Sequence, residues 1–348
     1  MPNRPPDHEP RFPGFTARIP EDVNEIIFCQ YGASAPVAQV ADAEVDGLRR
    51  VFSSEAAPDV LDRGEFVDRA GEHNHVLLAY WFDKQRFAAW RESPATLAVW
   101  RAHQESGPVG VWRETAVIPR PRLESLYSHP PGFAQTSGIT ASFDQDVTPY
   151  HDYWGAARDR IAESHQDPLD GELTHLNESP SLDARGRRVT VAGPGNLCLI
   201  RTAQDWTQSR TFREVYLNDV APVKDAGVEF LRRTPETGCV EARNISETDL
   251  DGRPLDRSCT IGWFISLRHL ESWTKSHKTH LAIYGSFFKM LQHSADPLDV
   301  AFWHEISVLP RGAVRGEYVN CHRDSGLLRL GAAHQVNLEE RQWVDTTA

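Results

Sequence analysis

The chain has 348 residues, of which 40% are hydrophobic and 25% charged, and it contains ten tryptophans, a composition that excludes an intrinsically disordered protein. Its formal net charge of −12 argues against a nucleic-acid partner, because phosphate binding needs a basic surface. The five cysteines show no C-x-x-C spacing, and no apolar run approaches the roughly 18 residues of a membrane span. We therefore expect a cytoplasmic protein without a signal peptide, a membrane span or a disulfide framework.

Prolines dominate the first 20 residues, at positions 2, 5, 6, 10, 13 and 20. Because proline blocks both a helix and a central strand, we expect an extended arm at 1–20. Such an arm either crosses onto a partner subunit or forms a plain tail. After it, an apolar run at 26–31 that stops at Gly32 predicts a strand, and helical spacing of apolar residues predicts a helix at 37–52.

A block with the order strand, helix, strand then occurs twice. Its elements are expected at 75–81, 83–100 and 110–119, and again at 259–265, 267–291 and 300–309, with the first helical stretch interrupted at Pro94. Aligned pairs are Trp81-Phe82 with Trp263-Phe264, Trp112-Arg113-Glu114 with Trp303-His304-Glu305, and residues 96–100 with residues 280–284. Strands and helices that alternate in this way indicate an α+β fold made of two ferredoxin-like units.

The segment between the two blocks is less regular. It contains an apolar strand at 196–202 and an expected helix around 212–231. We divide the chain into the N-terminal arm at 1–20, a first ferredoxin-like half at 21–130, a middle segment at 131–258, a second half at 259–330 and a C-terminal tail at 331–348. The two sheets can pack on one another or close into a barrel, which leaves a pocket between sheet and helices.

The second block has histidines at two positions where the first has none. Alternation in the strand places His304 on one face with Val300, Phe302, Ile306 and Val308. A core histidine satisfied by one hydrogen bond and a functional imidazole in a dry pocket both fit this pattern. The functional interpretation gains support from the first block, which has arginine at the equivalent position. Because one copy has arginine and the other histidine, packing alone does not determine this residue.

His280 begins an apolar helical stripe that continues through Ile283, Tyr284, Phe287 and Leu291. Three interpretations compete: a histidine at a helix end without a function, a His-x-x-His metal pair with His277, and a single axial ligand to haem. One histidine beside many apolar residues suits haem better than zinc, which needs three or four close ligands. Without a C-x-x-C-H sequence, such a haem would be held non-covalently. His322, after another expected strand, is a weaker second candidate for the pocket.

Five segments, in this order, carry a resemblance to a known family. They are HDYWG at 151–155, IRTAQDW at 200–206, SHKTHL at 276–281, WHEISV at 303–308 and YVNCH at 318–322. Together they resemble the haem-containing aldoxime dehydratases, and the resemblance extends from about residue 20 to residue 330.

The resemblance implies roles for five residues of this chain. His280 corresponds to the proximal haem ligand, although Lys278 stands where the family usually has proline. His304 corresponds to the distal acid–base histidine. Thr202 stands where the family has a serine that binds the substrate hydroxyl; it keeps the hydroxyl and adds a methyl group. Arg160 and Glu124 correspond to supporting groups of the distal site, and we expect Glu124 to favour the charged form of the histidine.

The same resemblance implies an activity and a cofactor. The protein would be a lyase that converts an aldoxime, R-CH=N-OH, to a nitrile and water, with the substrate nitrogen bound to ferrous haem b. It implies a dimeric α/β-barrel-type haem domain, that is, a homodimer without membrane or nucleic-acid partners. The alternatives are a haem peroxidase, another haem lyase acting on N–O or N–N bonds, and a non-catalytic haem carrier or sensor.

Overall fold

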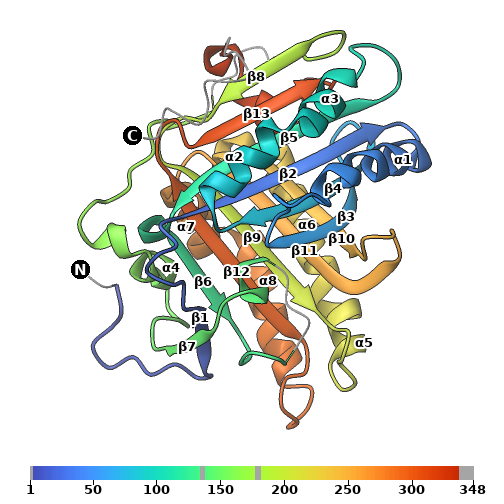
Figure 1. Ribbon diagram of the computed structural model, residues 1–348. Helices are drawn as coiled ribbons and strands as arrows, with labels where there is room; N and C mark the ends of the chain where they lie inside the picture. Colours follow the sequence, from blue (N-terminus) through green and yellow to red (C-terminus); the bar gives the residue numbers. More distant parts are fainter. Residues whose placement is uncertain (1–2, 134–137, 177–181, 337–348) are drawn as a thin grey trace.

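A computed structural model describes residues 3–133, 138–176 and 182–336; residues 1–2 of the expected arm and 337–348 of the expected tail lie outside it (Figure 1). In this part of the chain one antiparallel sheet has the strand order β7-β1-β6-β12-β9-β11-β10-β3-β4-β2-β5-β13-β8. The strands are β1 (Gly14–Ala17), β2 (Glu25–Ala35), β3 (Val60–Val67), β4 (His73–Trp81), β5 (Gly110–Pro119), β6 (Leu123–Tyr127), β7 (Gln145–Thr148), β8 (Arg188–Ala192), β9 (Leu197–Asp205), β10 (Cys239–Thr248), β11 (Pro254–Phe264), β12 (Ala301–Leu309) and β13 (Val314–Val319).

Helices connect the strands. They are α1 (Ala38–Arg49), α2 (Lys84–Glu92), α3 (Pro94–Ala102), α4 (Ala156–Arg160), α5 (Arg213–Val215), α6 (Ala221–Arg233), α7 (Leu267–Ser276) and α8 (Lys278–Leu291). A π-helical turn at Tyr216–Val220 joins α5 to α6, which completes the helix expected around 212–231. The fold is therefore mixed α and β, as the sequence predicts, and among the described residues no helix is long and apolar enough to cross a bilayer.

Strand order repeats within the sheet. Between β2 and β5 the chain runs strand, helix, strand, strand, helix, strand, and the sheet order is β5-β2-β4-β3. Between β9 and β12 the chain repeats this sequence of elements, and the sheet order is β12-β9-β11-β10. The two sets meet where β3 pairs with β10, for example at Glu65 and Ser246. Strands far apart in the sequence thus take equivalent places on either side of this junction (Figure 1).

Two buried hydrogen bonds show which residues are equivalent. The Tyr80 hydroxyl donates to Glu305 Oε2 at 2.9 Å, and Trp263 Nε1 donates to Glu114 Oε2 at 2.9 Å. Tyr80 therefore occupies the place of Trp263, whereas Trp81 faces the helices. Since a shift of one residue reverses the face of a strand, the alignment of Trp81 with Trp263 is off by one residue. By the same test of faces, Glu114 and Glu305 remain aligned.

Gly32 does not end the first strand. The strand was expected to stop there, but β2 continues to Ala35. The indole of Trp112 lies 2.4 Å from where a Cβ atom would be, so glycine permits a close approach of strand and side chain. Pro94 interrupts the first helical stretch as expected, and Ser93 caps α3 by accepting from Thr96 N at 3.1 Å.

The second helical stretch also divides in two. It was expected to run from 267 to 291, but α7 ends at Ser276 and α8 begins at Lys278. His277 between them has an extended backbone, and its side chain accepts a hydrogen bond from Thr279 N at 3.3 Å. An N-cap of this kind starts a new helix whose axis is free to differ from that of α7.

The N-terminal arm packs on its own chain. Gly14–Ala17 forms β1, which pairs with β6 and β7 at one end of the sheet. Asn3 and Arg11 reach further elements, Asn3 through Asp159 and Arg11 through Asp152. All five cysteines are buried and free, as their spacing predicts.

Candidate active site

The register of three adjacent strands brings the expected residues to one region of the sheet. His304 on β12 pairs with Thr202 on β9, and with Leu126 on β6 on its other side. Glu124 lies two residues from Leu126 on β6, and Arg160 is the last residue of α4. Side chains two residues apart in a strand point to the same face, so the sheet itself places Glu124 beside His304.

Glu124, Arg160 and His304 form a compact polar cluster. Arg160 Nε donates to Glu124 Oε2 at 2.6 Å, and Glu124 Oε1 lies 3.1 Å from His304 Nε2. The exposed fraction is 0% for the Glu124 side chain, 5% for that of Arg160 and 26% for that of His304. The histidine is thus the member that other molecules can reach.

Glu124 is ionised in this environment. Burial alone would raise the pKa of its carboxyl group, but the charges of Arg160 and His304 and their hydrogen bonds outweigh burial and lower the pKa. Arg160 is in turn held by the backbone carbonyl of Tyr150. The cluster therefore keeps a fixed negative charge and a fixed positive charge next to one imidazole.

His304 Nε2 has both a donor and an acceptor within reach. Nη2 of Arg160 lies 3.1 Å away and Oε1 of Glu124 also lies 3.1 Å away. Without a proton, Nε2 accepts from Arg160; with a proton, it donates to Glu124. A cationic donor and an anionic acceptor thus both lie within reach of Nε2, which suits a group that gains and loses a proton during a reaction.

Thr202 offers a hydroxyl group next to this cluster. Its Oγ1 donates to the backbone carbonyl of Trp303 at 3.3 Å, which leaves its oxygen lone pairs able to accept a hydrogen bond. Thr202 is partly exposed, whereas its neighbours Arg201 and Ala203 on the opposite face are buried. This hydroxyl can therefore orient a polar group of a bound molecule.

His280 lies in the first turn of α8 between two aromatic rings. The Trp273 ring centroid is 4.8 Å from that of His280, and the Trp154 centroid is 6.3 Å away. Burial lowers the pKa of His280 to about 4, against the opposing influence of the Thr274 carbonyl, so the imidazole is neutral. Its buried Nδ1 has no hydrogen-bond partner among the described residues. A neutral imidazole is the form that binds metal ions.

The two halves differ in the space between helix and sheet. In the first half, Trp100 of α3 packs on Tyr31 at 5.7 Å between ring centroids and on the Arg113 guanidinium, 4.1 Å from its ring centroid. In the second half, the aligned Tyr284 of α8 is 39% exposed, and its ring contacts are to Trp154 and Phe288.

The sheet face opposite α8 is correspondingly less covered. Thr202 and His304, like Ile200 and Phe302 on the same strands, are only partly buried although β9 and β12 lie inside the sheet. The far end of α8 does reach this face, where the ring centroids of Phe287 and Phe302 lie 5.1 Å apart. A partly exposed apolar surface, together with a neutral imidazole on α8 whose Nδ1 has no partner among the described residues, fits a flat apolar group such as haem.

The other interpretations of these histidines find less support. The His277 ring stacks on Phe230, 4.2 Å between centroids, and caps α8, which accounts for it without a metal. Among the described residues, the group of three potential metal ligands consists of Asp68, Glu72 and His322 and does not include His280.

The group around His322 is an ion-pair cluster. Asp68 accepts from His322 Nε2 at 2.9 Å, from Asn74 and from two backbone N–H groups, and Glu72 pairs with Arg185. With the Asp68 oxygens already occupied and a guanidinium alongside, a cation has little to gain there. His322, a weaker candidate for the pocket, therefore lies in a cluster with Asp68 rather than with Glu124 and Arg160.

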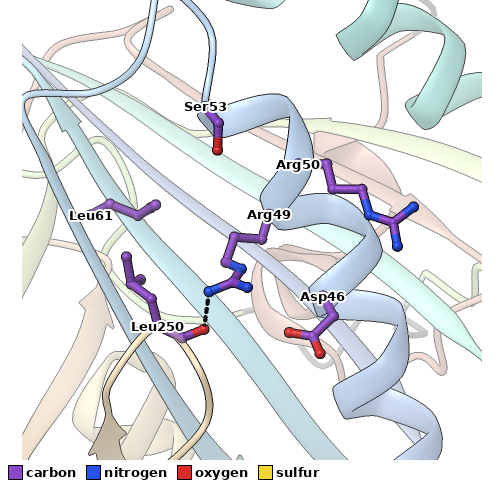
Figure 2. A pocket seen from close by; sticks show the side chains of 6 residues that line it. All are labelled: Asp46, Arg49, Arg50, Ser53, Leu61 and Leu250. Atoms are coloured by element: carbon purple, nitrogen blue, oxygen red, sulfur yellow. Dashed lines mark hydrogen bonds between the residues drawn. The ribbon is translucent and has the colours of Figure 1, made fainter.

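A cavity of about 340 Å³ lies elsewhere, against α1 (Figure 2). Its lining residues are Asp46, Arg49, Arg50, Ser53, Leu61 and Leu250. In Figure 2, Arg49 crosses it to donate to the Leu250 carbonyl. The lining contains no imidazole or thiol and none of the five expected site residues, so the chemistry argued from the sequence does not belong there.

Sequence reasoning did not single out the aromatic residues around His280. Trp154 lies in the HDYWG segment, and Trp273 lies on α7 seven residues before His280. The signal for Trp154 was its place in a shared segment that also precedes Arg160. No sequence pattern pointed to Trp273, because its contact with His280 depends on the break between the helices α7 and α8.

Comparison with known proteins identifies close relatives over nearly the whole chain. A family model described as haem-containing dehydratase matches residues 26–327. The chain is 34% identical over 333 residues to phenylacetaldoxime dehydratase of Bacillus sp. (strain OxB-1), covering 94% of each chain. It is 31% identical to aliphatic aldoxime dehydratase of Pseudomonas chlororaphis, covering 93% of each.

Solved structures give the same result. A crystal structure of an aldoxime dehydratase superposes with a TM-score of 0.85 at 29% identity, covering 94% of each chain. A second aldoxime dehydratase structure, in complex with butyraldoxime, gives a TM-score of 0.85 at 29% identity and covers 94% of this chain and 92% of that one.

Proposed function

This chain belongs to the haem-containing dehydratase family, and on that premise we propose that it binds haem and dehydrates aldoximes to nitriles, R-CH=N-OH giving R-C≡N and water. The observation that carries the proposal is the combination of a neutral, partly buried His280 on α8 and the Glu124–Arg160–His304 cluster on the sheet, with α8 packed on the strand of His304 through Phe287 and Phe302.

His280 is the residue that we expect to hold the haem. Its Nδ1 lacks a partner, its pKa is low because of burial, and Trp154 and Trp273 flank its ring. When bound, the haem would supply a ferrous iron whose open side can bind the aldoxime nitrogen and weaken the N–O bond. The attachment would be non-covalent.

His304 would move the protons. The leaving hydroxide needs one proton, and the aldoxime carbon must lose one, so a single imidazole can give the first and take the second. Arg160 Nη2 and Glu124 Oε1 each lie 3.1 Å from its Nε2. Because the proton is returned, the group is ready for the next turnover.

Thr202 would orient the substrate. It lies directly opposite His304 in the strand register, and its oxygen can accept a hydrogen bond from the aldoxime hydroxyl. Holding that hydroxyl beside the imidazole restricts the substrate to a reactive orientation. The added methyl group of threonine narrows the space next to it.

A haem peroxidase is the second candidate, favoured by the contact between His304 and Arg160, since a distal histidine and arginine also suit peroxide cleavage. The carrier or sensor alternative needs His304 as a second iron ligand. In the structure its Nε2 is directed at Glu124 and Arg160 instead.

The deciding experiment uses purified, haem-supplied protein reduced with dithionite under argon. We expect a Soret band and conversion of an aldoxime to its nitrile without peroxide or oxygen. A Soret band without nitrile, but with peroxide-dependent oxidation of a dye, would instead establish the peroxidase. His280→Ala should lose haem, whereas His304→Ala should keep haem and lose turnover.

We also propose that the two repeated strand orders are a duplicated pair of ferredoxin-like units. The support is the shared order of strands and the matched bonds of Tyr80 and Trp263. On this division the second unit begins at Leu197, so that β9 and β10 join it rather than the middle segment. A homodimer is expected from the resemblance, and light scattering of the haem-loaded protein would measure it.

A further inference from the structure

The N-terminal arm crosses the surface between the two elements that carry the haem site. Asn3 binds Asp159 Oδ1 through its backbone N at 2.7 Å and its side chain at 2.8 Å. His8 Nε2 donates to the carbonyl of His151 at 2.9 Å. These contacts fix the arm to the segment that ends in Arg160.

Arg11 extends the contact to α8. Its Nε donates to Asp152 Oδ2 at 2.7 Å, and its Nη2 donates to the Tyr284 hydroxyl at 2.9 Å. Its guanidinium also lies 4.1 Å from the ring centroid of Phe288. One side chain therefore joins α8 to the segment that precedes α4.

Tyr284 connects Arg11 to the proposed iron ligand. It follows His280 by one helical turn, and the Trp154 ring lies beside both, 5.7 Å from Tyr284 and 6.3 Å from His280. Asp152 has a φ of 65°, a left-handed backbone conformation that surrounding contacts must hold in place. Arg11 supplies such contacts, because its backbone N and its guanidinium both donate to the Asp152 carboxylate.

The two ends of α8 are held differently. Towards its C-terminus, Met290 is buried in a cluster with Phe212 and Tyr216. Towards its N-terminus, Leu281 is 41% exposed and Tyr284 is 39% exposed. The half of α8 that carries His280 thus depends more on contacts from outside the core, and Arg11 makes one of them.

We propose that Arg11 is a positioning residue for the haem site. By tying Tyr284 to Asp152, it holds the first turns of α8 against the segment that carries Arg160, and so slows the loss of haem. The inference rests on the proposed function, since it takes His280 as the axial ligand. The arm acts as a strap in cis, on the same chain.

The test measures haem loss from the holoenzyme. Haem-loaded wild type and Arg11→Gln are each mixed with excess apo-globin, and transfer is followed in the Soret band. We expect haem loss roughly tenfold faster in Arg11→Gln, since a charge-assisted hydrogen-bond pair is removed. Tyr284→Phe, which removes one of these bonds and keeps the ring, should accelerate haem loss less.

Arg18→Gln is the matched control. Arg18 is also in the N-terminal region and pairs with exposed carboxylates, Asp144 and Asp146, next to β7. Arg18→Gln makes the same change in net charge as Arg11→Gln. We expect its haem loss to stay within about twofold of wild type, because the partners of Arg18 are exposed and lie away from α8, whereas Asp152 is 8% exposed and Arg11 also binds Tyr284. Urea midpoints of both variants should equal that of wild type.

Haem loss from Arg11→Gln at the wild-type rate overturns the positioning role and leaves the proposed function intact. Faster loss together with a lowered urea midpoint assigns Arg11 to general stability, which also overturns it. A wild-type protein that shows no Soret band after haem supply overturns both this inference and the proposed function.

Discussion

Oε1 of Glu124 lies 3.1 Å from Nε2 of His304, and the carboxylate is fully buried whereas the imidazole is partly exposed. A buried carboxylate whose pKa is lowered stays negative. It therefore places a fixed negative charge beside the imidazole.

Glu124→Gln should reduce kcat/KM for an aldoxime by roughly 100-fold, within the range typical of acid–base catalysis. The amide removes the negative charge that lies 3.1 Å from His304 Nε2, so the imidazole loses the anionic group that orients it. Glu163→Gln is the control, because Glu163 pairs with Arg122 at 2.6 Å and its side chain is 29% exposed. An unchanged kcat/KM in Glu124→Gln would show that Glu124 does not act on His304.

Two substitutions of Thr202 separate the contribution of its hydroxyl group to activity from that of its methyl group. Thr202→Val keeps the shape and removes the donor and acceptor, so kcat/KM should fall by about tenfold, the value of one hydrogen bond. Thr202→Ser keeps the hydroxyl and removes the methyl group. Its kcat/KM for a short aldoxime should stay within about threefold of wild type, and its kcat/KM for a bulky aldoxime should rise. Steady-state rates with a short and a bulky aldoxime measure both effects. Undiminished activity in Thr202→Val would remove the residue from the mechanism.

His322 and Asp68 predict a pH dependence of stability. Burial lowers the pKa of His322, but the hydrogen bond and charge of Asp68 outweigh it, and the pKa is raised. A group whose pKa is raised on folding stabilises the folded state. This contribution is complete below the unfolded pKa of about 6.5 and is lost as the pH rises through the folded pKa.

The substitution His322→Gln should therefore lower the free energy of unfolding more at low pH than at high pH. We expect the free energy of unfolding to fall by about 1 kcal/mol at about pH 5.5, allowing for solvent screening, and by less at about pH 8.5. Urea unfolding followed by circular dichroism, at both pH values, measures the difference between variant and wild type. An equal loss at the two pH values would contradict the ion pair.

The sequence predicted the elements of the site better than their contacts. The aligned segments with Arg113-Glu114 and His304-Glu305 identified equivalent strands, and alternation identified the face of His304. The one-residue error at Trp81 arose because Trp-Phe occurs in both copies, while the face of a strand depends on its pairing. Glu124 and Arg160 lie in other elements, and only the family resemblance pointed to them, since local patterns carry no information on contacts between distant strands.

A buried ion pair joins the two halves of the sheet. Arg243 of β10 binds both oxygens of Glu114 on β5, at 2.6 and 2.7 Å, and Tyr318 donates to the same carboxylate at 2.6 Å. Both side chains are almost completely buried, 0% exposed for Glu114 and 3% for Arg243. Removing one partner leaves an uncompensated buried charge, which typically costs about 3–5 kcal/mol.

Glu114→Gln should therefore lower the free energy of unfolding by about 3 kcal/mol or more. Asp144→Asn, which breaks an exposed pair with Arg18, should change it by less than about 1 kcal/mol. Urea midpoints of haem-loaded proteins measure both. Because Glu114 occupies in the first half the place of Glu305 in the second, a small effect of Glu114→Gln would mean that the matched acids do not hold the halves together, and that the strand pairing of β3 with β10 suffices.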